Sequence, residues 1–190
     1  MGNNVAEMLA ELRADHKNMT LLLNLLEQEA NRLYEGRDAD YELVYDIMRY
    51  ITVYPDAVHH PKEDRVYAEL KIVRPDLSKG LDRVLVDHRD LAELGMKLRN
   101  DIDSIMAGTA LRRNVIVADA MRYVQRLRDH MHWEERDLFV RIDEMVHDGH
   151  RLIVDSVDHD SEDPVFGPEV EEQFGKLFKS IQQTLDASHM

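Results

Sequence analysis

Four long stretches of this chain carry apolar residues at the spacing of an α-helix, and only short turns separate them. The stretches cover residues 5–34, about 41–73, about 79–106 and about 111–146. Consecutive helices joined by short turns must lie antiparallel. The pattern therefore predicts an all-α fold, an up-down-up-down antiparallel four-helix bundle over residues 1–147.

Residues 148–190 carry a different pattern. Residues 148–168 read as an acidic loop, and "GPEVEEQFGKLFKSIQQTL" predicts an additional C-terminal helix that packs on the bundle or extends from it. The second long stretch is also irregular, because "YPDAVHHP" at 54–61 disturbs it. Pro61 has no backbone donor, so the helix either bends there or restarts with Pro61 in its first turn.

The composition excludes several classes of function. A formal net charge of −14 argues against nucleic acid and anionic membranes as partners, because like charges repel. The absence of cysteine excludes disulfides, thiol catalysis, iron–sulfur ligation and cysteine zinc sites. No basic segment followed by an apolar run opens the chain, and no apolar stretch reaches the roughly 18 residues of a membrane span. We therefore expect a soluble, cytoplasmic protein, monomeric or homodimeric.

The second half of the chain nearly repeats a pattern of the first half. Two features recur in the same order: "DHK" at 15–17 returns as "DHR" at 87–89, and the pair His59 and Glu63 returns as the pair His130 and Glu134. One His-x-x-x-Glu pair is weak evidence, since such pairs arise by chance in a chain rich in acids. Recurrence of both features at nearly one offset indicates a shared structural role.

In an antiparallel bundle these histidines reach one level. A first turn centred near residue 37 lies almost midway in sequence between His16 and His59, so the two histidines stand at the same height above it. The turn near residue 109 likewise lies midway between His88 and His130. At about 1.5 Å rise per residue, the four imidazoles share a layer within roughly one helical turn.

Two acids join that layer, because positions four apart share a helix face: Glu63 with His59, and Glu134 with His130. Four imidazoles and two carboxylates inside an apolar bundle are costly unless something neutralises and binds them. Two divalent metal ions would meet that need, each with two histidine nitrogens and one oxygen from each bridging glutamate. Imidazole combined with carboxylate suits iron, and also manganese or zinc.

The pattern resembles a known family. A histidine in the first helix, "HHPKE" in the second, "DH" in the third and "HMHWEE" in the fourth are similar to the hemerythrin-like, HHE cation-binding domains over about residues 5–146. The resemblance implies two iron ions in a non-haem di-iron centre with a bridging oxygen atom and two bridging carboxylates. It assigns terminal ligand roles to His16, His59, His88 and His130 and bridging roles to Glu63 and Glu134.

The chain departs from the oxygen carriers of this superfamily at the third helix. Those carriers place two histidines four apart, whereas neither residue four positions from His88 is a histidine here. A five-histidine set would need His60 or His132, which we keep as possible additional ligands. Since the carriers use a carboxylate five residues after the fourth-helix histidine, Glu135 remains an alternative bridge.

Three further residues allow both a functional and a purely structural interpretation. Asp15 and Asp87 could orient ligand histidines as hydrogen-bond acceptors, or they could belong to a solvated face. Tyr67 reads as a core residue rather than a cofactor contact.

We expect a protein that binds or reacts with a small ligand such as oxygen, nitric oxide or peroxide, in sensing, protection or carriage, rather than a dedicated enzyme. The alternatives are a di-iron peroxidase or catalase-like enzyme, an iron storage or delivery protein, and a metal-free helical interaction domain. A ferritin-like carboxylate site is not favoured, since the one Glu-x-x-His pair, Glu144 and His147, lies at a helix end. His-Glu-x-x-His is absent, which argues against a zinc hydrolase.

Overall fold

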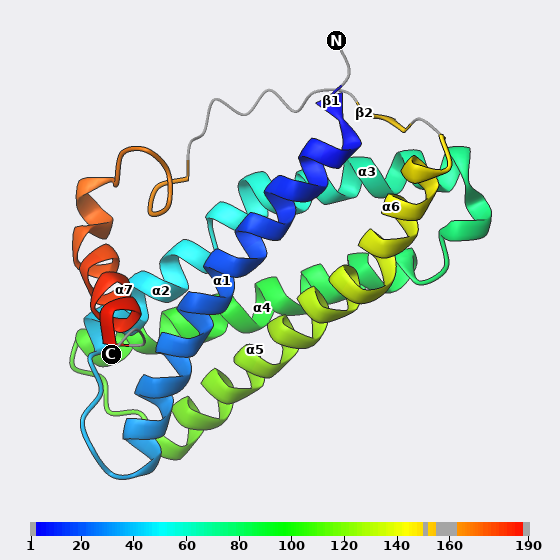
Figure 1. Cartoon of the computed structure of the whole chain (residues 1–190). Coiled ribbons are helices and arrows are strands. Elements are labelled where there is room, and N and C mark those ends of the chain that lie inside the picture. The colour runs from blue at the N-terminus through cyan, green and yellow to red at the C-terminus, as the bar shows by residue number, and fades with distance from the viewer. Residues whose placement is uncertain (1–2, 150–151, 155–162, 188–190) are drawn as a thin grey trace.

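The structure is a computed structural model that describes residues 3–149, 152–154 and 163–187. Its helices are α1 (Val5–Tyr34), α2 (Tyr41–Ile51), α3 (His60–Val73), α4 (Leu81–Met106), α5 (Arg113–Trp133), α6 (Phe139–His147) and α7 (Gly175–Ala187). The long helices lie side by side (Figure 1). The all-helical class that the sequence predicts is therefore confirmed. No helix in the described part of the chain is long and apolar enough to cross a membrane.

The helices pack around two apolar clusters. α1 packs against α5 and α2, and α4 packs against the same two helices. Along α1, Leu12 belongs to one cluster and Met19 to the other; along α4, Val84 and Leu91 are divided in the same way. The residues between these positions include two of the predicted ligands. One level of the bundle is therefore polar, with an apolar core on each side of it.

The irregular second stretch contains a π-helical turn, η1 (Pro55–His59), directly before α3. The His60 N–H donates to the Pro55 carbonyl, five residues back. Pro61 falls in the first turn of α3, which is the second of the two arrangements predicted for it.

A second π-helical turn, η3 (Glu134–Leu138), separates α5 from α6. The prediction of one continuous α-helix over residues 111–146 is therefore wrong at this point, where the Phe139 N–H donates to the Glu134 carbonyl. Such turns are frequent at functional sites. Here η1 ends at one predicted ligand, His59, and η3 begins at another, Glu134.

The C-terminal segment folds back onto the bundle, where α7 packs against α2 and α1 (Figure 1). The predicted helix from residue 167 begins only at Gly175, after a short turn η4 (Glu172–Phe174). Asp163 organises the preceding turn, because its Oδ1 accepts the N–H groups of the two residues that follow Pro164, each at 2.8 Å. Much of the predicted acidic loop, residues 150–151 and 155–162, lies outside the described residues, and a unit boundary at residue 147 stays a prediction.

One short pair of strands supplements the helices. β1 (Asn3–Asn4) pairs antiparallel with β2 (Ile153–Val154). The pairing brings the start of α1 beside the segment that follows α6 (Figure 1). The sequence pattern does not predict it, because two residues are too few to show a strand period.

Candidate metal centre

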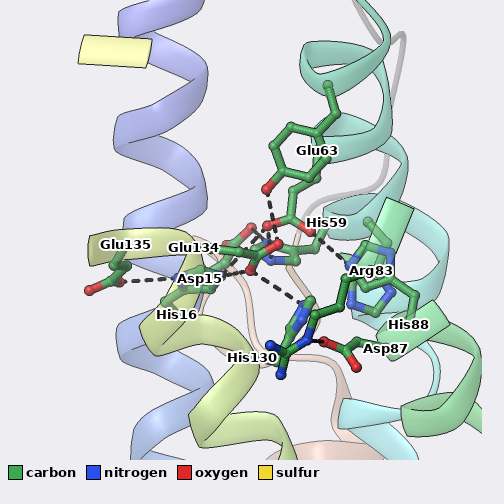
Figure 2. A network of polar contacts seen from close by, with 12 residues as sticks. Asp15, His16, His59, Glu63, Arg83, Asp87, His88, His130, Glu134 and Glu135 are labelled. Carbon is green, nitrogen blue, oxygen red and sulfur yellow. Dashed lines mark hydrogen bonds and ion pairs between the residues drawn. The ribbon is translucent and has the colours of Figure 1, made fainter. Parts of the chain in front are cut away.

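The six predicted ligands lie in the polar level of the bundle, and all are buried. They come from six elements: His16 from α1, His59 from η1, Glu63 from α3, His88 from α4, His130 from α5 and Glu134 from η3. None of them is more than 9% exposed. Figure 2 shows their imidazole and carboxylate groups turned toward one another.

The donor atoms form two groups that share one carboxylate. His16, His59 and Glu63 make the first group, and His60, Glu63, His88 and His130 make the second. Within each group, one donor atom per residue lies within 4.8 Å of the others. Glu63 Oε1 lies 3.1 Å from His59 Nε2, whereas Glu63 Oε2 lies 3.4 Å from His88 Nε2. The two oxygens of Glu63 therefore face different groups.

Glu134 lies in the same level but presents one oxygen to it. Its Oε2 lies 3.6 Å from His16 Nε2 and 3.3 Å from His130 Nε2. Its Oε1 instead accepts a hydrogen bond from the Tyr67 hydroxyl at 2.9 Å. Glu134 thus faces both groups through a single atom.

Seven buried side-chain atoms in the described part of the chain have no hydrogen-bond partner, and all of them belong to this cluster. They are His16 Nε2, His88 Nε2, both nitrogens of His130, both oxygens of Glu63 and Oε2 of Glu134. A buried polar group left unpaired costs roughly 1–3 kcal/mol, and more when it is charged. Metal cations would bind every one of these atoms except His130 Nδ1, so the donor set fits metal ions of the iron, manganese or zinc type.

Most of the imidazoles have a carboxylate near Nδ1, on the side of the imidazole that faces away from the other ligands. The pairs are His16 with Glu135 at 3.1 Å, His59 with Asp15 at 3.1 Å, His60 with Asp56 at 3.0 Å and His88 with Asp64 at 3.8 Å. A carboxylate on Nδ1 fixes the tautomer and the ring orientation, which leaves Nε2 free to bind a metal ion.

The two central carboxylates differ in pKa when no metal is bound. Burial acts to raise the pKa of Glu63, but the surrounding histidines, His59 first, hold that pKa well below its usual value. Burial, and after it the Glu63 charge, raises the pKa of Glu134 well above its usual value. The metal-free site therefore favours the ionised form of Glu63 and the protonated form of Glu134, as expected of two acids that share one buried site.

The histidines differ as well. Burial acts to lower the pKa of His59, but Glu63 and Asp15 outweigh it and raise the pKa to about 9. Burial lowers the pKa of His130 to about 3. His130 is therefore neutral at neutral pH, which is the form that binds metal.

The three residues kept as additional ligands lie in different places. His60 joins the second donor group, and its ring stacks on the ring of His88 with 4.0 Å between centroids. The Glu135 side chain is 44% exposed and contacts His16 from outside the cluster. His132 is exposed, and its Nε2 lies 3.3 Å from an Arg136 nitrogen, apart from both groups.

Outside the ligands, sequence reasoning located some residues and missed others. Asp15 contacts His59 as one of its two readings predicts, whereas Asp87 pairs with Arg126 at 3.0 Å. The role of Asp56 was not predicted. Tyr67 belongs to the apolar core as predicted, but its hydrogen bond to Glu134 was not foreseen. Each lies four positions from a cluster residue, so helical spacing was the available signal.

A comparison with protein-family models agrees with this geometry. The model of the hemerythrin HHE cation-binding domain matches residues 7–142, a range that contains both donor groups and Glu134. Searches of curated proteins and of solved structures found no match. The matched range covers well over half of the chain. The chain belongs to the hemerythrin HHE cation-binding domain family.

Proposed function

We propose that this protein holds two metal ions, iron in preference to manganese or zinc, and binds a small ligand such as oxygen, nitric oxide or peroxide there. One observation carries the proposal: buried donor atoms without partners gather in two groups that share Glu63. Membership of the family supports metal-cation binding. The mixture of imidazole and carboxylate donors favours iron.

The two metal positions are unequal. His60, His88 and His130 would hold one ion, and His16 and His59 the other. Glu63 would give one oxygen to each ion, and Glu134 would add Oε2 between them. The two-histidine position has fewer protein donors, so we assign the small ligand to it.

A reduced iron pair, when bound, supplies electrons to oxygen or a related ligand. The chain itself binds and orients the donors and excludes water. Phe139 is fully buried and stacks on His16 with 5.6 Å between ring centroids, which closes one side of the cluster. The carboxylates behind the imidazoles keep the Nε2 atoms directed inward.

The topology of the bundle, the location of the protein and its oligomeric state belong to the same proposal. We infer four antiparallel rods in up-down-up-down order, with α2, η1 and α3 forming the second rod and α5, η3 and α6 the fourth. We further infer a cytoplasmic monomer or homodimer that uses the ligand in sensing, protection or carriage. The net charge of −14 supports a small molecule rather than nucleic acid or a membrane as the partner.

Metal content and visible absorption test the proposal. Protein loaded anaerobically with Fe(II) is expected to retain two ions per chain and to gain a visible absorption band when oxygen or nitric oxide is added. His59→Ala should lose iron and the band, whereas His132→Ala, which removes an exposed histidine, should keep both.

Three results would contradict this function. Wild-type protein without bound metal and without a band would remove it altogether. Sustained turnover of peroxide would replace ligand binding by a peroxidase or catalase-like activity. Transfer of the iron to an acceptor protein would replace it by storage or delivery.

A further inference from the structure

The two central acids offer different numbers of oxygens, although the internal repeat makes them equivalent in sequence. Both are fully buried. Neither oxygen of Glu63 has a hydrogen-bond partner, whereas Glu134 lacks a partner only at Oε2. The difference arises from Tyr67, whose hydroxyl donates to Glu134 Oε1 at 2.9 Å.

The repeat shows that this hydrogen bond is specific to one half of the chain. The offset that relates Glu63 to Glu134 also relates Tyr67 to Leu138. Leu138 is fully buried and has no polar atom in its side chain, so it cannot donate to the first acid as Tyr67 donates to the second.

We propose that Tyr67 is a positioning residue that restricts Glu134 to one metal-binding oxygen, Oε2, while Glu63 binds through both of its oxygens. The inference rests on the metal binding proposed above.

Tyr67 and Glu134 are both buried, so few other hydrogen-bond partners are available to either side chain. Tyr67 is only 4% exposed, and a buried phenol hydroxyl without a partner is costly. The phenol hydroxyl donates and the carboxylate oxygen accepts, so this one contact pairs both buried groups. Oε1 is therefore engaged whenever Glu134 faces the cluster through Oε2.

The consequence for the centre is an asymmetry between its acids. Two acids that each gave both oxygens would supply four carboxylate donors to two ions. With Oε1 held by the phenol, the number falls to three. The missing donor leaves one position for a small ligand or a water molecule.

Tyr67→Phe tests the inference, because it removes the donor and keeps the ring. We would load the full chain with Co(II), whose visible bands weaken as its coordination number rises. Release of Oε1 lets Glu134 bind through both oxygens, so the Co(II) bands of the variant should weaken. Tyr123→Phe is the matched control, since Tyr123 is similarly buried, at 3% exposure, and no acid of the cluster contacts its hydroxyl. Its spectrum should equal that of wild type.

Infrared difference spectra, Co(II)-loaded minus metal-free, give a second readout. A carboxylate that binds through one oxygen separates its antisymmetric and symmetric stretches more widely than one that binds through both. Wild-type protein should show two distinct separations, and Tyr67→Phe should lose the wider one. Thermal unfolding of each variant shows whether it is folded; if Tyr67→Phe is not, the wild-type infrared spectrum decides.

The possible failures are distinguishable. Unchanged Co(II) bands and unchanged carboxylate separations in Tyr67→Phe would overturn the role of Tyr67, as would a single carboxylate separation in wild type. Wild-type protein that binds no Co(II) would instead overturn the proposed metal site.

Discussion

Glu134→Gln is expected to leave the metal-free protein nearly unchanged and to destabilise the metal-loaded protein. Burial and the nearby Glu63 charge raise the pKa of Glu134 well above its usual value, which favours the protonated, neutral side chain when no metal is bound. Glutamine has almost the shape of a protonated glutamate, and its oxygen can still accept from Tyr67. With metal bound, the variant lacks the anionic oxygen that faces both donor groups.

The size of the effect follows from binding linkage. A metal ion present at about 100 times its dissociation constant stabilises the folded state by about 2.7 kcal/mol. If loss of the anionic donor weakens one ion about 100-fold, most of that stabilisation is lost. For a chain of 190 residues the loss of about 2.3 kcal/mol corresponds to a fall of about 5–9 °C in melting temperature. Without metal, a swap that conserves volume should cost less than about 1.5 kcal/mol.

Thermal unfolding of wild type and Glu134→Gln measures both values, once with anaerobic Fe(II) and once with a chelator. Glu93→Gln is the control, because Glu93 is exposed on α4 and should change neither melting temperature. An equal loss for Glu134→Gln under both conditions would refute the reasoning. Glu134 would then contribute to the fold itself rather than to metal binding.

Two further perturbations have expected outcomes. Tyr50→Phe removes the 2.7 Å hydrogen bond to Asp163 and should cost about 1.5 kcal/mol, read as a lower urea midpoint at unchanged slope. For His59, burial acts to lower the pKa, but Glu63 and Asp15 raise it from 6.5 to about 9. Its protonated form therefore stabilises the metal-free fold fully below pH 6.5, and this contribution is lost as the pH rises through 9. A metal ion must displace that proton, so His59 by itself should make the metal affinity rise roughly tenfold per pH unit in this window.

Much of the fold could be predicted because it depends on local patterns. Apolar spacing placed the helices, and Gly36, which adopts a positive φ of 80°, ends α1 where the first turn was predicted. The late start of α7 could not be predicted, because Asp163 accepts the N–H groups of Val165 and Phe166 and holds the chain in a turn just before the predicted helix. The same carboxylate accepts a hydrogen bond from Tyr50, which lies more than a hundred residues away in the chain, and no local pattern shows that contact.

The candidate site, like the fold, could be predicted in part. Counting residues from the turns predicted which histidines share a level, and the structure brings His16, His59, His88 and His130 together. Counting gives height along the bundle but not which carboxylate stands behind which ring. Glu135, for example, reaches His16 across 119 positions of sequence.

The π turn at η3 follows from the spacing of the buried residues around it. His130, Glu134, Leu138 and Ile142 are all buried and lie four positions apart. In a regular α-helix, twelve residues turn about 120° beyond three full turns, so the last of the four would leave the face of the first. One π turn holds an extra residue and removes about 100° of that drift.

The same spacing recurs around η1, where Ile51, Pro55, His59 and Glu63 are all buried. A rod that must keep four residues at steps of four on one face has to be underwound at some point, and in both rods this occurs at the ligands. An isolated His-x-x-x-Glu pair needs no such correction, because one step of four drifts by only about 40°. It is the continuation of the spacing into the apolar core that requires the π turn. A run of core and ligand residues at steps of four in the sequence therefore indicates that these ligands lie on an underwound turn.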